Sequence, residues 1–153
     1  MITKKTKYAL KALQFLAGFP PGQPVLIADL AAGENIPRKF LEFILLSLRK
    51  GGILQSRIGK GGGYWLALPP QKIRLGTVIR ILEGDLAPVT CLSTTNYTLC
   101  DECTDQQLCG IRLVMIDVDS AVNRVVDSLT LADILERSEQ ARQMRQNVVD
   151  FAI

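Results

Sequence analysis

The chain of 153 residues is 48% hydrophobic and 22% charged, as in an ordinary soluble globular protein. No apolar run approaches the roughly 18 residues that a membrane-spanning helix needs. Lysines precede an apolar stretch near the N-terminus, but Lys11 and Gln14 interrupt that stretch and no cleavage site follows, which argues against a signal peptide. We therefore expect a cytoplasmic protein with one domain, or with a small domain and an appendage.

The net charge of +3 is unevenly distributed along the chain. Residues 1–74 carry 12 Lys and Arg against 3 Asp and Glu, a balance of +9. Residues 75–153 carry 6 against 12, a balance of −6. A basic first half is typical of a segment that faces a polyanion, although charge alone is equally compatible with an ordinary solvated surface.

Three helices are predicted in the first 50 residues. Apolar side chains at helical spacing mark a first helix over residues 5–19, which ends at a Pro-Pro-Gly stop. A short second helix around Leu30 is followed by a tight turn, and a third helix begins near Pro37 and ends at Gly51. Two short helices joined by such a turn form the helix-turn-helix pattern.

A β-hairpin is predicted directly after the third helix. Two short strand-like runs, residues 53–57 and 64–68, flank a glycine-rich turn. This turn lacks the spacing of a nucleotide-binding loop, and no long helix follows it, so a phosphate site is discounted. A hairpin in this position is a wing, and residues 75–82 read as one more short helix. Residues 1–83 therefore predict a winged helix-turn-helix DNA-binding domain.

Basic side chains occupy the three parts of this domain that could meet duplex DNA. The start of the third helix can reach base edges and phosphates in the major groove, and the wing has the size and charge to enter a minor groove. Lysines before the first helix could meet the phosphate backbone. These candidates are Lys4, Lys5, Lys7, Arg38, Lys39, Arg57 and Lys60.

Residues 84–107 form a loop without sustained periodicity that leads to a cluster of cysteines. All four cysteines of the chain lie within nineteen positions, at Cys91, Cys100, Cys103 and Cys109. A cytoplasmic protein would not normally keep them as disulfides, so they indicate a metal site, a cluster or redox-active thiols. Only Cys100 and Cys103 form the close pair typical of structural zinc, whereas iron–sulfur clusters accept more varied spacing. Spacing alone leaves all three open.

A long dimerisation helix is predicted after the loop. Seven apolar residues recur at alternating spacings of three and four, as in a coiled-coil seam of three heptads; they are Leu108, Ile111, Met115, Val118, Val122, Val125 and Leu129. This pattern predicts a homodimer, the alternative being a helix packed on its own domain. With a short closing helix at 131–135, the segment spans residues 108–136. The pattern does not place the polar tail 137–153.

The order of these elements, the segment 41–54 (LEFILLSLRKGGIL) and the wing sequence 59–64 (GKGGGY) resemble the IscR/NsrR-type, or Rrf-two, family of winged-helix iron–sulfur transcriptional regulators. The resemblance covers about residues 1–136. It implies a mostly α fold with a small β wing, a homodimer whose long C-terminal helices cross, and promoter binding controlled by a cluster. The cluster would be held by three cysteines and a variable fourth ligand.

The resemblance assigns Cys91, Cys103 and Cys109 as the three family ligands and leaves Cys100 as an extra cysteine. Family members complete the set with a histidine soon after the last cysteine, or with an acidic residue from the first helix of the partner subunit. This chain has no histidine, and Lys7 occupies the acidic position. We therefore expect Cys100 as the fourth ligand, and a 2Fe–2S cluster in preference to 4Fe–4S. The remaining oxygen donors are Asp101, Glu102 and Asp105.

The resemblance also places Glu42 near the bases, where a carboxylate can accept from cytosine, or repel phosphate unless it is held in place. Ile58 and Pro37 depart from the family pattern, so no DNA sequence preference is carried over. Without histidine or a recognisable pair of carboxylates, an enzyme is not expected. The predicted function is a DNA-binding transcriptional regulator modulated by an iron–sulfur cluster. The alternative is a regulator of the same fold that uses zinc or reactive thiols.

Overall fold

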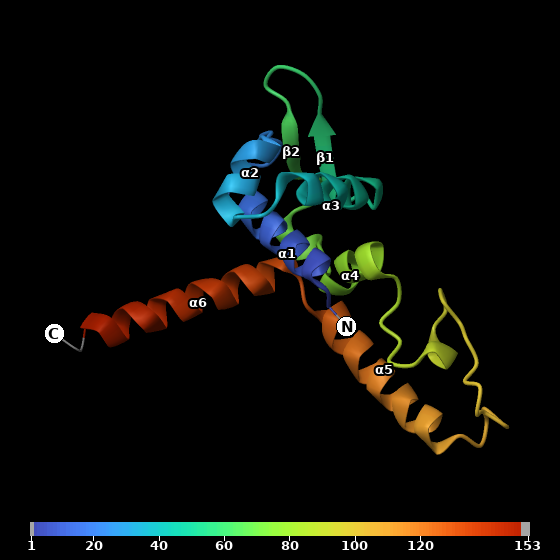
Figure 1. Ribbon diagram of the computed structural model, residues 1–153. Coiled ribbons are helices and arrows are strands. Elements are labelled where there is room, and N and C mark those ends of the chain that lie inside the picture. Colours follow the sequence, from blue (N-terminus) through green and yellow to red (C-terminus); the bar gives the residue numbers. More distant parts are fainter. Residues whose placement is uncertain (1, 151–153) are drawn as a thin grey trace.

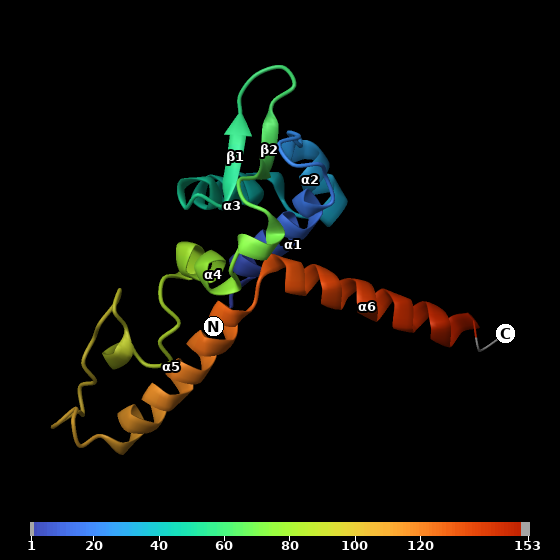
Figure 2. The ribbon, with the colours of Figure 1, turned by 180° about the vertical axis from the view of Figure 1, so that it is seen from behind.

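The computed structural model describes residues 2–150, and of residues 147–150 the backbone alone. A small domain carries a projecting hairpin, and two long helices extend from it in different directions (Figures 1 and 2). The elements in chain order are α1 (Lys4–Ala17), α2 (Ile27–Glu34), α3 (Arg38–Lys50), β1 (Leu54–Arg57), β2 (Gly63–Leu66), α4 (Leu75–Glu83), α5 (Gly110–Ser128) and α6 (Leu131–Asp150), with short 3₁₀ turns at Pro70–Lys72 and Thr90–Leu92. The predicted mostly α fold with a small wing is confirmed.

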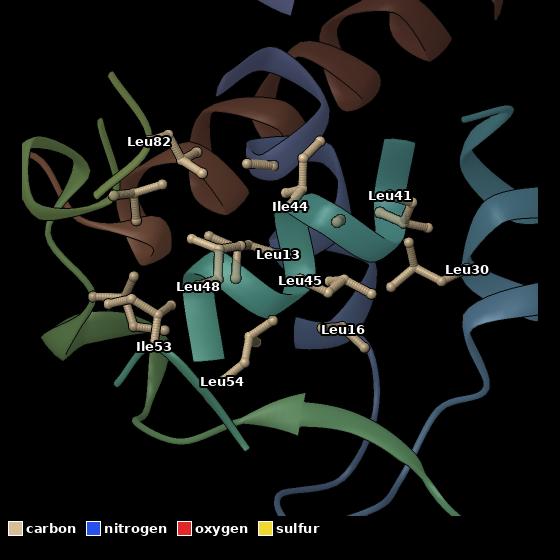
Figure 3. Close-up of a cluster of buried hydrophobic side chains, with 14 of the residues drawn as sticks. Leu13, Leu16, Leu30, Leu41, Ile44, Leu45, Leu48, Ile53, Leu54 and Leu82 are labelled. Carbon is tan, nitrogen blue, oxygen red and sulfur yellow. The ribbon is translucent and has the colours of Figure 1, made fainter. Parts of the chain in front are cut away.

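The core of the domain forms where α3 packs on α1. The buried stripe of α3 follows helical spacing, and its side chains point toward Leu13 and Leu16 of α1 and Leu30 of α2 (Figure 3). This stripe consists of Leu41, Ile44, Leu45 and Leu48, all fully buried. Because one face of α3 is buried in the core, the opposite face of the helix is exposed to solvent.

The predicted turn between α2 and α3 is present and is stabilised by Asn35. This residue adopts the left-handed conformation, with φ 51° and ψ 50°, and the next amide, of Ile36, donates back to the Ala31 carbonyl at 3.0 Å. Such a cap satisfies carbonyl groups at the end of α2 and reverses the chain. Pro37 then precedes the first residue of α3, as the sequence indicated. The turn thereby sets the position of α3 on the domain.

The wing is an antiparallel pair in which Leu54 lies opposite Leu66 and Arg57 opposite Gly63. β2 also bridges to Val25, which anchors the hairpin to the domain. A Cβ atom at Gly63 would lie 2.3 Å from the Val25 carbonyl oxygen, so this position needs glycine. The turn itself projects beyond the domain (Figure 1).

The first residue of α5, Gly110, lies at the end of the helix farthest from the domain. The helix then runs back to the domain, where α6 starts (Figure 1). Leu131, at this junction, is 2% exposed and donates its amide to the Ile73 carbonyl at 2.8 Å. The junction is therefore attached to the segment that precedes α4. None of the helices in the described part of the chain is both long and apolar enough to cross a membrane.

α6 is much longer than the short closing helix predicted for 131–135, and the tail that the sequence left unplaced is helical up to Asp150. Residues 151–153 lie outside the described part of the chain. The helix begins with a reciprocal cap, in which the Thr130 amide donates to the Asp133 carboxylate at 2.7 Å and the Asp133 amide donates to the Thr130 hydroxyl at 3.3 Å. No glycine or proline interrupts it. The prediction failed because apolar periodicity, on which it relied, fades after Leu135.

Candidate functional site

The outward face of α3 carries the side chains predicted to meet DNA at this helix. Arg38, Lys39 and Glu42 are all exposed. Arg38 Nε donates to Glu42 Oε1 at 3.2 Å, and the two residues of this ion pair are one helical turn apart. Such an exposed pair contributes little to stability, but it holds the carboxylate and offsets its charge. Glu42 therefore meets the condition under which a carboxylate is tolerated beside phosphates.

The wing presents its own basic residues, one of which also braces the turn. Arg57 donates from Nη2 to the Gly61 carbonyl at 2.9 Å, whereas Lys60 is exposed at the turn. Arg49, which the sequence analysis did not single out, donates from α3 to the Ser56 hydroxyl on β1 at 3.1 Å. This hydrogen bond links the wing to α3, in addition to the burial of Leu54 and the bridge to Val25.

The N-terminal lysines differ in their availability. Lys4 and Lys7 are exposed, whereas the Lys5 ammonium donates to the Leu82 carbonyl at the end of α4. The ring of Tyr8 packs edge-on against Phe40, with centroids 5.7 Å apart, and this contact joins the N-terminal halves of α1 and α3. Lys4 and Lys7 therefore remain candidates for phosphate contacts, and Lys5 acts at least in part within the fold.

The end of α4, where the cysteine loop begins, is attached to the start of α1. Thr6 is fully buried and donates to Glu83 Oε1 at 2.6 Å, and the Thr3 hydroxyl donates to the same oxygen. Burial would raise the pKa of Glu83, but the hydrogen bonds from Thr3 and Thr6 and the charge of Lys5 lower it below its usual value. Glu83 is therefore ionised at neutral pH and links the loop to the DNA-binding domain.

All four cysteines line one cavity of about 230 Å³ beside the start of α5. Cys91 is buried in the 3₁₀ turn, Cys100 is exposed, Cys103 and Cys109 are partly buried, and none forms a disulfide. The remaining lining residues are Val89, Glu102, Ile111 and Arg112. The structure thus brings together the four predicted ligands, and Glu102 is the one acidic candidate that joins them.

The thiols share the cavity without forming a finished metal site. Within residues 2–150, no group of three or more His, Cys, Asp or Glu side chains is arranged to hold a metal ion. Asp101 and Asp105 do not line the cavity, and Asp105 Oδ1 instead accepts from the Gln107 amide at 2.7 Å. The donor set fits an iron–sulfur cluster or zinc in kind and number, but binding requires the thiols to move closer together.

The charges around the cavity favour a cationic or electron-poor occupant. The pKa of the Cys100 thiol is raised by desolvation and by the charges of the other three thiols and Glu102. Arg112 is the cation that lines the cavity, and its Nε is buried without a hydrogen-bond partner. A buried N–H group without an acceptor lowers the stability of the fold, so an occupant of the cavity that accepts from Arg112 Nε would be favoured. Thiolate or sulfide sulfur meets that need.

The first half of the cysteine loop is organised by Asp85, which sequence reasoning missed. Its carboxylate accepts from the hydroxyls of Ser93 and Thr94 at 3.0 and 2.9 Å, and from the Thr95 amide at 3.0 Å. These hydrogen bonds hold the pKa of Asp85 far below its usual value, although burial alone would raise it. Residues 85–95 are thus held around Cys91 without any metal.

α5 leaves a broad apolar face exposed in the single chain. Its exposed apolar side chains include Ile111, Leu113, Val114, Ile116, Val118, Val122 and Val125. The contact of α5 with α4 uses the adjoining side of the helix, where Asn123 and Asp127 accept from Arg80 and Val126 is buried. Most of the predicted seam is thus exposed in the single chain, but Met115 and Leu129 are half-buried, and Leu108 and Leu129 lie just outside α5. The exposed apolar surface is also wider than a narrow heptad stripe.

The fold and the exposed basic helix and wing define a winged-helix transcriptional regulator. Residues 2–137 match the family model described as Rrf2, iron-dependent transcriptional regulator, and the chain belongs to this family. It is 39% identical over 150 residues to a putative HTH-type transcriptional regulator, rrf2-like, of Rhodobacter capsulatus, which covers 96% of this chain and 100% of that protein. These proteins are regulators, and the expectation that the chain is not an enzyme is confirmed.

Two further relatives match most of the chain. The HTH-type transcriptional regulator NsrR of Geobacillus kaustophilus is 33% identical over 94% of this chain and 95% of its own length. The structure of CymR, the global cysteine regulator of Bacillus subtilis, matches with a TM-score of 0.71 and 31% identity over 90% of this chain and 97% of that one. The resemblance predicted from the third helix and wing is therefore confirmed at the level of the family.

Proposed function

We propose that this protein is a homodimeric DNA-binding transcriptional regulator whose affinity for promoters depends on an iron–sulfur cluster in the cysteine cavity. The cluster would be held by Cys91, Cys100, Cys103 and Cys109. The observation that carries the proposal is that four thiols and the unpaired Nε of Arg112 line one cavity. When bound, the cluster supplies a centre that responds to redox state and to iron. DNA binding and reduced thiols imply a cytoplasmic protein.

The proposal gives a route from the cavity to DNA through the chain's own residues. Cys91 is buried in a 3₁₀ turn just before the residues that Asp85 holds, whereas Cys109 precedes the first residue of α5. Drawing the thiols together would therefore fix the start of α5 relative to the end of α4. In a dimer through α5, this would set the separation of the two α3 helices, which need about 34 Å to enter successive major grooves.

On DNA, the proposal assigns base and phosphate contacts to α3 and phosphate or minor-groove contacts to the wing. Lys39 and Lys60 are exposed and carry no ion pair among the described residues. Arg38 and Glu42 act as a pair, and Arg57 presents its guanidinium while bracing the turn. Lys4 and Lys7 extend the basic surface from α1. Each lysine on a phosphate is expected to contribute about one unit to the salt slope of binding.

A second occupant of the cavity is supported by specific observations. The thiols are not prearranged around a metal, and Cys100 and Cys103 have the close spacing typical of structural zinc. The similarity to CymR adds a relative named for cysteine regulation. A regulator of the same fold that binds zinc, or that responds through reactive thiols, is therefore the alternative.

Anaerobic purification with analysis of iron, sulfide and zinc distinguishes these functions. A brown protein with two irons and two sulfides per chain supports the preferred cluster, and four of each supports the 4Fe–4S alternative. A colourless protein with one zinc, or with no metal, refutes cluster binding and supports the alternative. Salt-dependent binding of the loaded and metal-free forms to duplexes selected from a random library then tests DNA recognition separately.

A further inference from the structure

The side of α3 that faces away from the core carries apolar residues at the middle of the helix. The buried stripe is centred on Ile44 and Leu45, so the opposite side of the helix falls near Phe43 and Leu46. Phe43 is 59% exposed and Leu46 is 37% exposed. These residues are three apart and therefore adjacent on the helix surface. Phe43 and Leu46 therefore form an exposed apolar patch on the side of α3 that points away from the core.

Phe43 is also free of the aromatic packing that engages its neighbour. Phe40 packs on Tyr8, and the other aromatic pair among the described residues joins Phe15 to Phe19. Phe40 is therefore engaged within the fold, whereas the ring of Phe43 has no such partner in the described chain. The exposure of Phe43 costs hydrophobic free energy that a bound partner would recover.

Lysines flank this apolar patch at both ends. Lys39 lies one turn before Phe43, and Lys50 lies one turn after Leu46, and both are exposed. The nearby negative charge of Glu42 is offset by Arg38. An apolar centre between two cations complements a major groove, where phosphates border the groove and thymine methyl groups form apolar points on its floor. Charge complementarity therefore favours duplex DNA over an apolar protein surface.

We propose that Phe43, supported by Leu46, is a specificity-determining residue that contacts thymine methyl groups in the major groove. The inference rests on the proposed function, because it requires α3 to be the reading helix. It goes further by naming the chemical group that is read. The preferred site would carry thymine at the one or two positions of each half-site that face the middle of α3.

Substitution of deoxyuridine for thymidine tests this inference, because it removes only the methyl group. Starting from a duplex selected by the full-length dimer, each thymine is replaced in turn and affinity is measured at fixed salt. At the contacted position, we expect an approximately fourfold loss for the wild type, as for burial of one methyl-sized group. Phe43→Ala should bind the thymine duplex more weakly and show no further loss on the uracil duplex.

Met144→Ala provides the matched control, since Met144 is an exposed apolar residue on α6, and this variant should retain the fourfold loss. Leu46→Ala serves as a second variant, with a reduced methyl effect, should Phe43→Ala not fold. The inference is overturned if the wild type binds specifically with no methyl effect at any position, or if Phe43→Ala keeps the full effect. It is also overturned if Phe43→Ala changes dimerisation instead. Absence of any specific duplex binding would overturn the proposed function, and this inference with it.

Discussion

The guanidinium of Arg80 on α4 donates to both carboxylate oxygens of Asp127 on α5, at 2.6 and 2.9 Å. The hydrogen bond and the charge of Arg80 lower the pKa of Asp127, despite some desolvation. The approach of the two helices depends on Gly76, because a Cβ atom there would lie 2.0 Å from Asp127 Oδ1. α4 also packs against α1 and α3. This contact therefore sets how the DNA-binding domain is held on the helix with the exposed apolar face.

Arg80→Met should weaken specific DNA binding more than it weakens folding. Both partners are partly exposed, so the loss of stability should stay within about 1 kcal/mol. The loss in DNA affinity should be larger, since the two reading helices of the dimer would no longer hold one separation. Thermal melting and duplex affinity measure the two effects. Arg142→Met, which removes an exposed pair with Glu139 within α6, should change neither. Equal effects of the two variants on DNA binding would contradict the proposed role of α4.

Asp85→Asn should loosen the first half of the cysteine loop at neutral pH. The pKa of Asp85 is lowered on folding, so its stabilising contribution is present above the unfolded pKa and is lost as the pH falls through the lower folded value. In the metal-free wild type, we therefore expect constant amide chemical shifts for Thr94 and Thr95 from pH 8 down to about pH 4, and changes only in stronger acid. The variant should show displaced shifts throughout and no acid transition. Unchanged shifts in the variant would show that the carboxylate does not hold the loop.

The chain should form a homodimer through the exposed face of α5. Replacing both Val118 and Val122 with Asp would bury unpaired charges in the seam and should give monomers by sedimentation, with a large loss of affinity for a two-half-site duplex. Ser120→Asp adds charge to an exposed position of α5 outside the heptad pattern and should leave the dimer intact. A double variant that stays dimeric would show that the dimer does not form through this face of α5.

Local sequence patterns predicted the DNA-binding domain well. The spacing of Leu41, Ile44 and Leu48 predicted the buried face of α3, because helix periodicity and burial follow the same rule. Glycines predicted the wing turn because several of them have positive φ. Contacts between residues far apart were missed. No local pattern near Asp85 indicates its partners, which lie eight to ten positions later in the chain. The same holds for Arg80, whose partner Asp127 lies 47 positions later. The length of α6 was missed because the helix is mostly polar.

Arg112→Gln should lower the reduction potential of the bound cluster. Four thiolates and Glu102 give the loaded cavity a negative charge, and Arg112 is the cation that lines it. Removing a positive charge stabilises the oxidised form over the more negative reduced form, by on the order of 50–100 mV at an effective protein dielectric. Arg112→Lys should restore part of the shift, and Arg124→Gln, at an exposed position of the same helix, should cause none. An unchanged potential in Arg112→Gln would show that the side chain does not face the cluster.

The identity of the fourth ligand separates this chain from the family pattern. Each iron of a small cluster prefers four ligands, and thiolates are the usual way to supply them. With no histidine in the chain and Lys7 at the family's acidic position, Cys100 is the remaining thiol, and it lines the cavity with the other three. Cys100 lies on the exposed side of the cavity, in a turn where the Cys103 amide donates to its carbonyl at 3.1 Å. Ligation would therefore require Cys100 to approach the other three thiols.

Cys100→Ser should accordingly bleach or alter the visible spectrum of the anaerobically purified protein and change DNA binding as cluster loss does. Cys91→Ser provides the reference for complete loss, because Cys91 is the buried thiol and one of the three ligands that the family resemblance assigns. If Cys100→Ser keeps the wild-type spectrum while Cys91→Ser loses it, the fourth ligand is an oxygen. Glu102 would then be the donor, since it is the carboxylate that lines the cavity, and Glu102→Gln should bleach the cluster instead. A wild-type spectrum in both Cys100→Ser and Glu102→Gln would place the fourth ligand outside this cavity.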